Sequence, residues 1–259
     1  MSSRSLKGLW APALALALTA AACGGGAKEE APAAAPPPPP ATVIDPATAA
    51  GVSGLVKFDG AVPPVQRIKM AADPICARAN TDPKSDTVVI APDGAMANVL
   101  VYVKDGLTGH FPAPATPVVL NQLGCQYKPH VFGVQVGQPL QVVNSDPTLH
   151  NVHAMPKVNQ EFNTGQPIQG MKFDHTFTAR EVMVPFKCDV HGWMSAHAAV
   201  LDHPFFAVTG PDGRFELKGL PPGTYTLEAV HEKLGVQTLT VELAAKDAKT
   251  ADFSFKVQS

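Results

Sequence analysis

From residue 51 onward, short runs of alternating apolar and polar residues are separated by turns rich in glycine and proline. Strand-like apolar runs fill residues 97–103, 130–136 and 140–144, and residues 171–177 alternate with a period of two. Alternation with a period of two predicts strands that bury one face. No clear amphipathic helix is evident, although residues 68–80 could form a short one. Many short strands between such turns predict an all-β fold of the sandwich or barrel type.

The first 22 residues follow a different pattern. Arg4 and Lys7 precede an apolar run over residues 9–22 that ends in three alanines, which is typical of a signal peptide. The run is short for a membrane span. Cys23 and Gly24 follow at once and resemble the cleavage site of a bacterial lipoprotein, with Cys23 as the lipidated residue. Ala20 departs from that pattern, where leucine is usual, and an ordinary secretory signal is the alternative.

Residues 23–50 are rich in glycine, alanine and proline, with an unbroken proline run at 36–40. Such a segment favours an extended conformation and is expected to act as a tether. The lipoprotein resemblance implies a position on the periplasmic face of the bacterial outer membrane, with a soluble periplasmic or secreted protein as the alternative.

Net charge and the absence of common catalytic motifs argue against nucleic-acid binding and against enzymatic activity. The chain has 259 residues, enough for one or two domains, and its net charge of -2 gives no reason to expect nucleic acid as a partner. Walker, G-x-S-x-G, H-E-x-x-H and C-x-x-C-H strings are absent from the sequence. We therefore expect no enzymatic activity.

Residues 186–194, Phe-Lys-Cys-Asp-Val-His-Gly-Trp-Met, hold the most distinctive chemistry. Cys188, His191 and Met194 lie three residues apart, on what reads as a tight loop between two strands. A thiolate, two imidazoles and a weak axial thioether describe a blue-copper site. The set needs a second histidine, and the best candidate is His150.

The strings Leu-His-Asn-Val-His at 149–153 and Cys-Asp-Val-His-Gly-Trp-Met at 188–194 together resemble the cupredoxin family, and most of all its amicyanin branch. The resemblance covers roughly residues 133–201. It implies a Greek-key sandwich with one mononuclear type 1 copper ion, held by His150, Cys188, His191 and Met194. It implies that Asn151 braces the ligand loop, and that the protein exchanges electrons with a redox partner protein.

Several alternatives stay open. Met194 could be core packing, His153 could simply face solvent, and His197 could compete as a ligand. Zinc also accepts cysteine and histidine, and a cysteine nucleophile activated by histidine is the enzymatic alternative. A copper-holding or delivery module and a structural envelope protein remain as rival functions. If the site transfers electrons, an exposed edge of His191 is the expected exit.

The two remaining cysteines, Cys76 and Cys125, are expected to form a disulfide, because an exported protein occupies an oxidising compartment. Two independent buried thiols are the alternative.

The last part of the chain carries a second resemblance. The strings at 211–215 and 220–227 are similar to those of the carboxypeptidase regulatory-like, transthyretin-like β-sandwich. We expect a copper domain over residues 51–203 and this smaller sandwich over residues 204–259. Residues 51–127 form a separate β segment or add strands to the copper domain.

Overall fold

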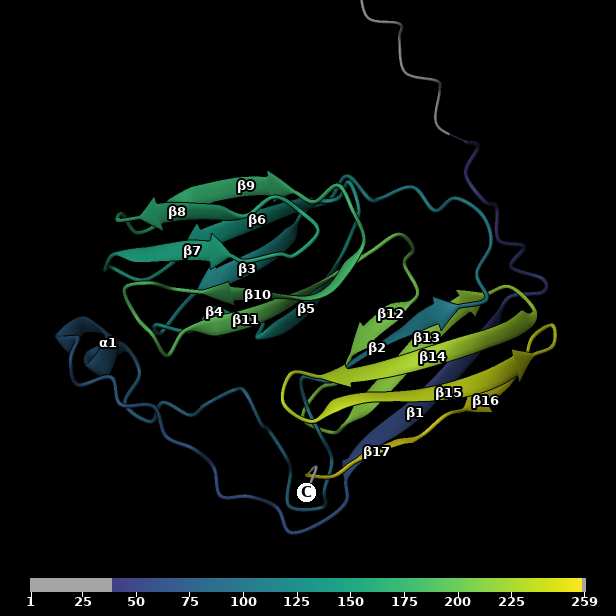
Figure 1. Cartoon of the computed structure of the whole chain (residues 1–259), viewed down its shortest axis with the longest axis horizontal. Helices are drawn as coiled ribbons and strands as arrows, with labels where there is room; N and C mark the ends of the chain where they lie inside the picture. The colour runs from purple at the N-terminus through teal and green to yellow at the C-terminus, as the bar shows by residue number, and fades with distance from the viewer. Residues whose placement is uncertain (1–38, 258–259) are drawn as a thin grey trace, which may run out of the picture. The chain divides into compact units, whose positions relative to one another are not determined.

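The computed structural model describes residues 39–257, and the statements below concern that part of the chain. It contains 17 strands and one six-residue helix, α1 (Pro74–Ala79). The all-β prediction is confirmed (Figure 1). None of its helices is long and apolar enough to cross a membrane. The expected signal peptide and the lipidated Cys23 lie outside the described residues.

The middle of the chain forms two sheets that share one hydrophobic core, and we call this unit the first sandwich. The sheets have the strand orders β5-β11-β10-β7-β8 and β4-β3-β6-β9. Its strands are β3 (Val118–Gln122), β4 (Tyr127–Lys128), β5 (Val131–Gln135), β6 (Pro139–Asn144), β7 (His150–Ala154), β8 (Phe162–Gln166), β9 (Lys172–Thr176), β10 (Glu181–Lys187) and β11 (Ser195–Leu201).

The two faces of strand β11 pack into two different hydrophobic clusters. Ala196, Ala198 and Val200 lie in the core of the first sandwich. Ala199 and Leu201 lie in a different hydrophobic cluster, because successive side chains of a strand point to opposite faces. His197 shares the parity of this second set.

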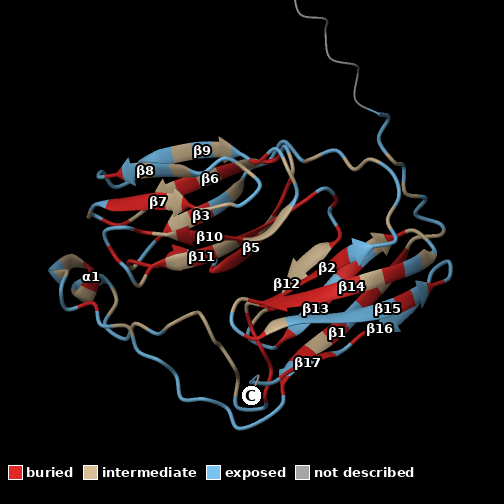
Figure 2. Ribbon diagram, in the orientation of Figure 1, coloured by how far each residue is buried: buried red, intermediate tan, exposed pale blue. Residues whose placement is uncertain are grey.

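The other strands form a second pair of sheets around their own core, and we call this unit the second sandwich. One sheet has the order β13-β1-β16, with β17 also paired to β1, and the other has the order β12-β2-β14-β15. Its strands are β1 (Ala50–Phe58), β2 (Leu100–Asp105), β12 (Phe206–Val208), β13 (Arg214–Leu220), β14 (Gly223–His231), β15 (Gly235–Leu243), β16 (Ala248–Thr250) and β17 (Phe253–Phe255). Figure 2 shows buried residues along the strands of both units.

The strand pairing differs from the division expected at residue 204. Strand β1 pairs antiparallel with β13 and parallel with β16 and β17, while β2 lies between β12 and β14. Residues 50–58 and 100–105 therefore belong with the C-terminal strands. In the sequence, the first sandwich is inserted between β2 and β12. Periodicity predicts which face of a strand is buried but not which strand lies beside it, so the sequence pattern could not show this arrangement.

Helix α1 lies in the connection between β1 and β2. Asp73 caps its first turn, because Asp73 Oδ1 accepts hydrogen bonds from the N–H groups of Ile75 at 2.7 Å and Cys76 at 3.1 Å. A disulfide joins Cys76 to Cys125, so the predicted pairing is confirmed. The bond attaches α1 to the first sandwich beside the cysteine and histidine cluster described next.

Candidate metal centre

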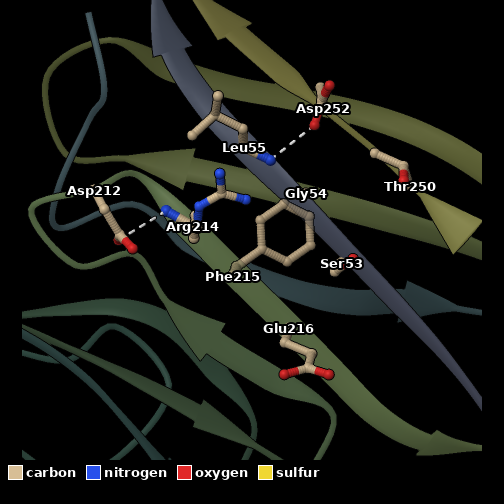
Figure 3. A pocket seen from close by; sticks show the side chains of 9 residues that line it. All are labelled: Ser53, Gly54, Leu55, Asp212, Arg214, Phe215, Glu216, Thr250 and Asp252. Atoms are coloured by element: carbon tan, nitrogen blue, oxygen red, sulfur yellow. Dashed lines mark hydrogen bonds between the residues drawn. The ribbon is translucent and has the colours of Figure 1, made fainter. Parts of the chain in front are cut away.

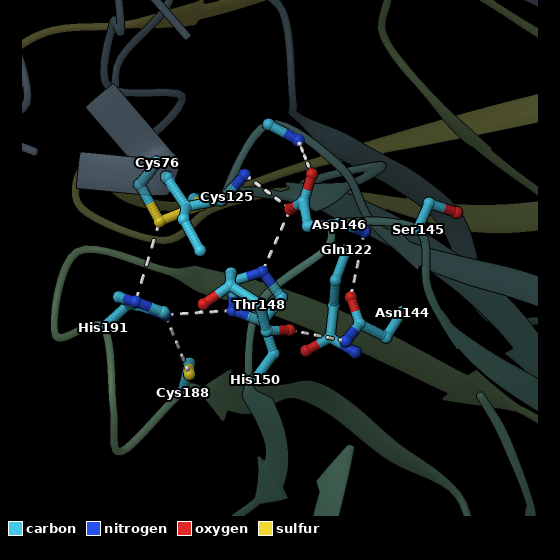
Figure 4. Close-up of polar contacts among 12 residues, drawn as sticks. Cys76, Gln122, Cys125, Asn144, Ser145, Asp146, Thr148, His150, Cys188 and His191 are labelled. Carbon is cyan, nitrogen blue, oxygen red and sulfur yellow. Dashed lines mark hydrogen bonds and ion pairs between the residues drawn. A yellow bond between two sulfur atoms is a disulfide. The ribbon is translucent and has the colours of Figure 1, made fainter. Parts of the chain in front are cut away.

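Three side chains from two parts of the first sandwich converge at one end of it (Figure 4). His150 Nδ1 lies 2.9 Å from His191 Nδ1, and Cys188 Sγ lies 3.8 Å from the same nitrogen. The ligand atoms of all three lie within 4.8 Å of one another. The residues are buried, with 0% of His150, 1% of Cys188 and 3% of His191 exposed. The sequence motif and its distant histidine thus meet in space.

The separations fit a single ion. Metal–nitrogen bonds of about 2.0 Å and metal–sulfur bonds of about 2.3 Å place two nitrogens roughly 3–3.5 Å apart and a nitrogen and a sulfur roughly 3.5–4 Å apart. The observed distances lie close to both ranges. Two imidazoles and a thiolate suit soft or borderline metals, above all copper and zinc.

Backbone bonds hold the ligand loop between β10 and β11. The N–H of Cys188 donates to the carbonyl of Met194 at 3.2 Å, and the N–H of Met194 donates to the carbonyl of His191 at 2.8 Å. Met194 is buried in the same core cluster as Cys188. His150 is the first residue of β7, so each donor sits at the end of a strand or on a loop fixed by strands.

Asn151 links β7 to this loop. Its Oδ1 accepts a hydrogen bond from the N–H of Asp189 at 2.6 Å and lies 3.2 Å from Cys188 Sγ. These are the contacts of a residue that braces the loop, and they place the thiol against the strand that carries His150.

Two carboxylates that the sequence did not reveal hold the histidines. Asp146 Oδ2 lies 3.0 Å from His150 Nε2, and Asp73 Oδ2 lies 3.0 Å from His191 Nε2. A carboxylate at one ring nitrogen keeps the proton there and leaves the other nitrogen free for a metal. Asp146 precedes His150 by only four residues, which is a weak signal in the sequence. Asp73 lies 118 positions from His191 and gives no signal at all.

His191 is covered, which corrects the expectation of an exposed edge. Cys76 Sγ of the disulfide lies 3.6 Å from His191 Nε2, beside the Asp73 carboxylate. The ring of Trp193 packs at 5.0 Å between centroids, and its Nε1 donates to the carbonyl of Cys125 at 3.0 Å. The physical reason is the disulfide, which ties the start of α1 over the ring.

The charges in the cluster favour a thiolate. Burial lowers the pKa of His150, but the contacts with Asp146 and Cys188 outweigh it and raise that pKa to about 9. Burial raises the pKa of Cys188, but the contact with His150 and nearby backbone N–H groups lower it further than burial raises it. The thiolate is the form that binds metals, so this environment prepares the sulfur as a ligand. His150 is protonated in the metal-free protein and releases the proton of Nδ1 when a metal binds.

The other histidines considered as ligands lie elsewhere. His153 contacts Asp189 at 2.9 Å and Glu161 at 2.8 Å near the surface. His197 lies on the strand face opposite the core that holds Cys188.

A pocket in the second sandwich lies over β1 and β13. It is lined by residues such as Arg214, Phe215 and Asp252, and neither cysteine nor histidine is among its lining residues (Figure 3).

No protein-family model matches the chain, and no curated protein matches it. Similar solved structures include a mutant of amicyanin with Cu(I), 22% identical over 32% of this chain and 81% of that chain, with a TM-score of 0.29. The novel purple cupredoxin from Nitrosopumilus maritimus is 24% identical over 29% of this chain and 81% of that chain, with a TM-score of 0.26. The Cu-containing nitrite reductase from Thermus scotoductus SA-01 is 21% identical over 40% of this chain, with a TM-score of 0.32. The match spans 26% of the reductase. At these TM-scores the similarities add nothing to the case for the site, which rests on its own geometry.

Proposed function

We propose that His150, Cys188 and His191 would bind one copper ion, with Met194 as a weaker fourth ligand, and that the chain transfers electrons as a type 1 copper protein. The convergence of two Nδ1 atoms and one sulfur within 4.8 Å of one another carries the proposal. Two imidazoles and a thiolate form the trigonal set of blue-copper sites. Copper bound there would supply one-electron chemistry, exchanged with a partner protein still to be identified.

The chain's own residues would hold that set still. Asp146 and Asp73 fix the two rings at Nε2, and Asn151 fixes the loop that carries the thiol. Electron transfer is fast when ligands move little between oxidation states, and a buried, hydrogen-bonded cluster meets that condition.

The test is an optical spectrum of purified, metal-free protein after addition of Cu(II). We expect an intense blue or green colour from charge transfer between thiolate and metal. The Cys188→Ser variant should lose it. The matched control is His153→Ala, which removes a nearby histidine outside the cluster and should keep the colour. Colourless protein that has nevertheless bound Cu(II) would contradict the proposal.

Copper holding or delivery is the second candidate, and the covered His191 favours it. A ring that is 3% exposed offers an electron partner no direct contact. This function predicts tight Cu(I) binding with little reversible redox cycling, whereas electron transfer predicts a reversible wave. Voltammetry of the copper-loaded protein separates the two.

We also propose that the chain is exported and lipidated at Cys23, on the periplasmic face of the outer membrane. The disulfide between Cys76 and Cys125 supports export, because such bonds persist in oxidising compartments. Labelling of cells with a fatty-acid analogue should mark the wild type and spare Cys23→Ala. Equal labelling of both would count against lipidation at this residue.

A further inference from the structure

We propose that His130, His197 and Glu232 form a second metal site, separate from the copper centre, for a divalent transition-metal ion such as zinc. One nitrogen from each ring and one carboxylate oxygen lie within 4.8 Å of one another. Two imidazoles and one carboxylate are a known ligand set for zinc, with water in the fourth position.

His130 directs one nitrogen at the carboxylate. Its Nδ1 lies 2.9 Å from the carbonyl of Ser195 and must donate to it, since a carbonyl only accepts. Its Nε2 therefore faces Glu232 Oε1, with which it is in contact. Two arrangements are possible for this pair: the direct hydrogen bond that the structure shows, or a metal ion that replaces its proton and moves the two atoms apart.

His197 distinguishes the two arrangements. Its Nδ1 is buried and has no hydrogen-bond partner among residues 39–257. It lies 3.9 Å from Glu232 Oε1, which is too long for a hydrogen bond. Donors bound to one ion at about 2.0–2.2 Å lie roughly 3–4 Å apart, so this distance suits two ligands of the same metal. A direct pair between His130 and Glu232 leaves this nitrogen unsatisfied, whereas a shared metal ion satisfies all three groups.

The scaffold already holds the three groups in place. The N–H of His197 donates to the carbonyl of His130 at 2.8 Å, which sets the two histidines on neighbouring chain segments. Glu232 lies in the turn between β14 and β15. His231 Nδ1 fixes that turn by accepting from the N–H groups of Lys233 at 3.1 Å and Leu234 at 3.2 Å.

The site is nearly closed to solvent. The side chains of His130, His197 and Glu232 are 5%, 16% and 7% exposed. A metal bound there would connect β11 of the first sandwich to the β14–β15 turn of the second. It would also be independent of Cys188, because His197 projects from the opposite face of β11.

The test is calorimetric titration of the full-length, metal-free Cys188→Ser protein with Zn²⁺, a background without the thiolate of the copper centre. We expect binding that is weakened by Glu232→Gln and by His197→Ala. Removal of a ligand should cost more than the roughly 10–100-fold in affinity that is typical of losing a contact behind a ligand. The matched control is Glu161→Gln, which removes the exposed carboxylate beside His153 and should change nothing.

Zinc affinity and stoichiometry that are the same in the background, Glu232→Gln and His197→Ala proteins would overturn the proposal. A background that binds no zinc would do so too. Should a variant fold poorly, crystals of the Cys188→Ser parent soaked in zinc decide the matter. An anomalous peak between the two rings and the carboxylate supports the site, and its absence at saturating zinc refutes it.

Discussion

At the scale of single residues, the centre depends on which nitrogen each histidine presents. His150 and His191 both turn Nδ1 to the cluster because a carboxylate holds the other nitrogen. The sequence could indicate the donors, since Cys188, His191 and Met194 follow a short spacing. It could not indicate the carboxylates, because an aspartate gives no pattern that distinguishes a buried partner from a solvated one.

Asp146 should matter for metal affinity although it is not a ligand. In Asp146→Asn the amide no longer provides the charge that orients and polarises His150, and we expect copper affinity to fall roughly 10–100-fold. A competition titration with a chelator measures it. Asp174→Asn is the control, because Asp174 is an exposed acceptor for Gln141 on the other sheet. Unchanged affinity in Asp146→Asn would show that the carboxylate is dispensable.

His203 should make the fold sensitive to acid. Its ring uses both nitrogens while neutral: Nε2 donates to the carbonyl of Val103 at 2.8 Å, and Nδ1 accepts from the N–H of Phe205 at 3.2 Å. Burial lowers its pKa below the ordinary 6.5. The unfolded chain therefore takes up a proton first as the pH falls, so this group contributes full stability above about pH 6.5 and loses it below.

The measurement is the unfolding free energy of metal-free protein in urea between pH 7.5 and 5. The decrease on acidification should be smaller in His203→Gln than in the wild type, whatever the absolute stability of the variant. His110→Gln is the control, and a variant slope equal to that of the wild type would contradict the assignment.

At the scale of elements, α1 and its disulfide form the cover of the centre. The strands and the ligand loop could be predicted from residue alternation and motif spacing. The disulfide could be predicted because an exported protein occupies an oxidising compartment. The position of α1 could not be predicted, because a six-residue helix has too few residues for a periodic signal and its place depends on one covalent bond.

Asp73 has two separable tasks, the helix cap through Oδ1 and the contact with His191 through Oδ2. Asparagine can still cap a helix, so Asp73→Asn should keep stability and weaken copper retention. Asp73→Ala should weaken retention and also lower the unfolding free energy by about 0.5–2 kcal/mol. Chemical unfolding and chelator competition report the two tasks. Equal stability of the two variants would show that the cap contributes nothing.

The disulfide should stabilise the fold and shield the centre. It closes a sequence separation of 49 residues, for which chain entropy gives about 4 kcal/mol. The Cys76→Ser/Cys125→Ser variant should therefore unfold more easily and lose copper faster to a chelator, because His191 is no longer covered. A variant with unchanged chelation kinetics would mean that other groups, such as Trp193, keep the ring covered.

At the scale of the whole molecule, the second sandwich is completed by strands from both ends of the described chain. A stop codon after Leu201 should therefore do more than remove a terminal unit. It leaves β1 and β2 without partners and exposes core residues such as Val56 and Val101. We expect strong binding of a hydrophobic dye and aggregation. Removal of only residues 256–259, beyond β17, should have neither effect, and a soluble, dye-negative truncation at Leu201 would contradict the pairing.

Because the first sandwich is inserted into the second, β1 is synthesised long before the strand with which it pairs. Phe58 ends β1 and Arg214 begins its antiparallel partner, 156 positions later (214 − 58). At roughly 5–20 residues per second the ribosome needs about 8–30 s to cover that interval. All nine strands of the inserted unit emerge within it. During that time β1 and then β2 are exposed without their strand partners, while the inserted unit has time to fold. A chaperone that binds this chain during synthesis is therefore expected to bind residues 50–58 and 100–105.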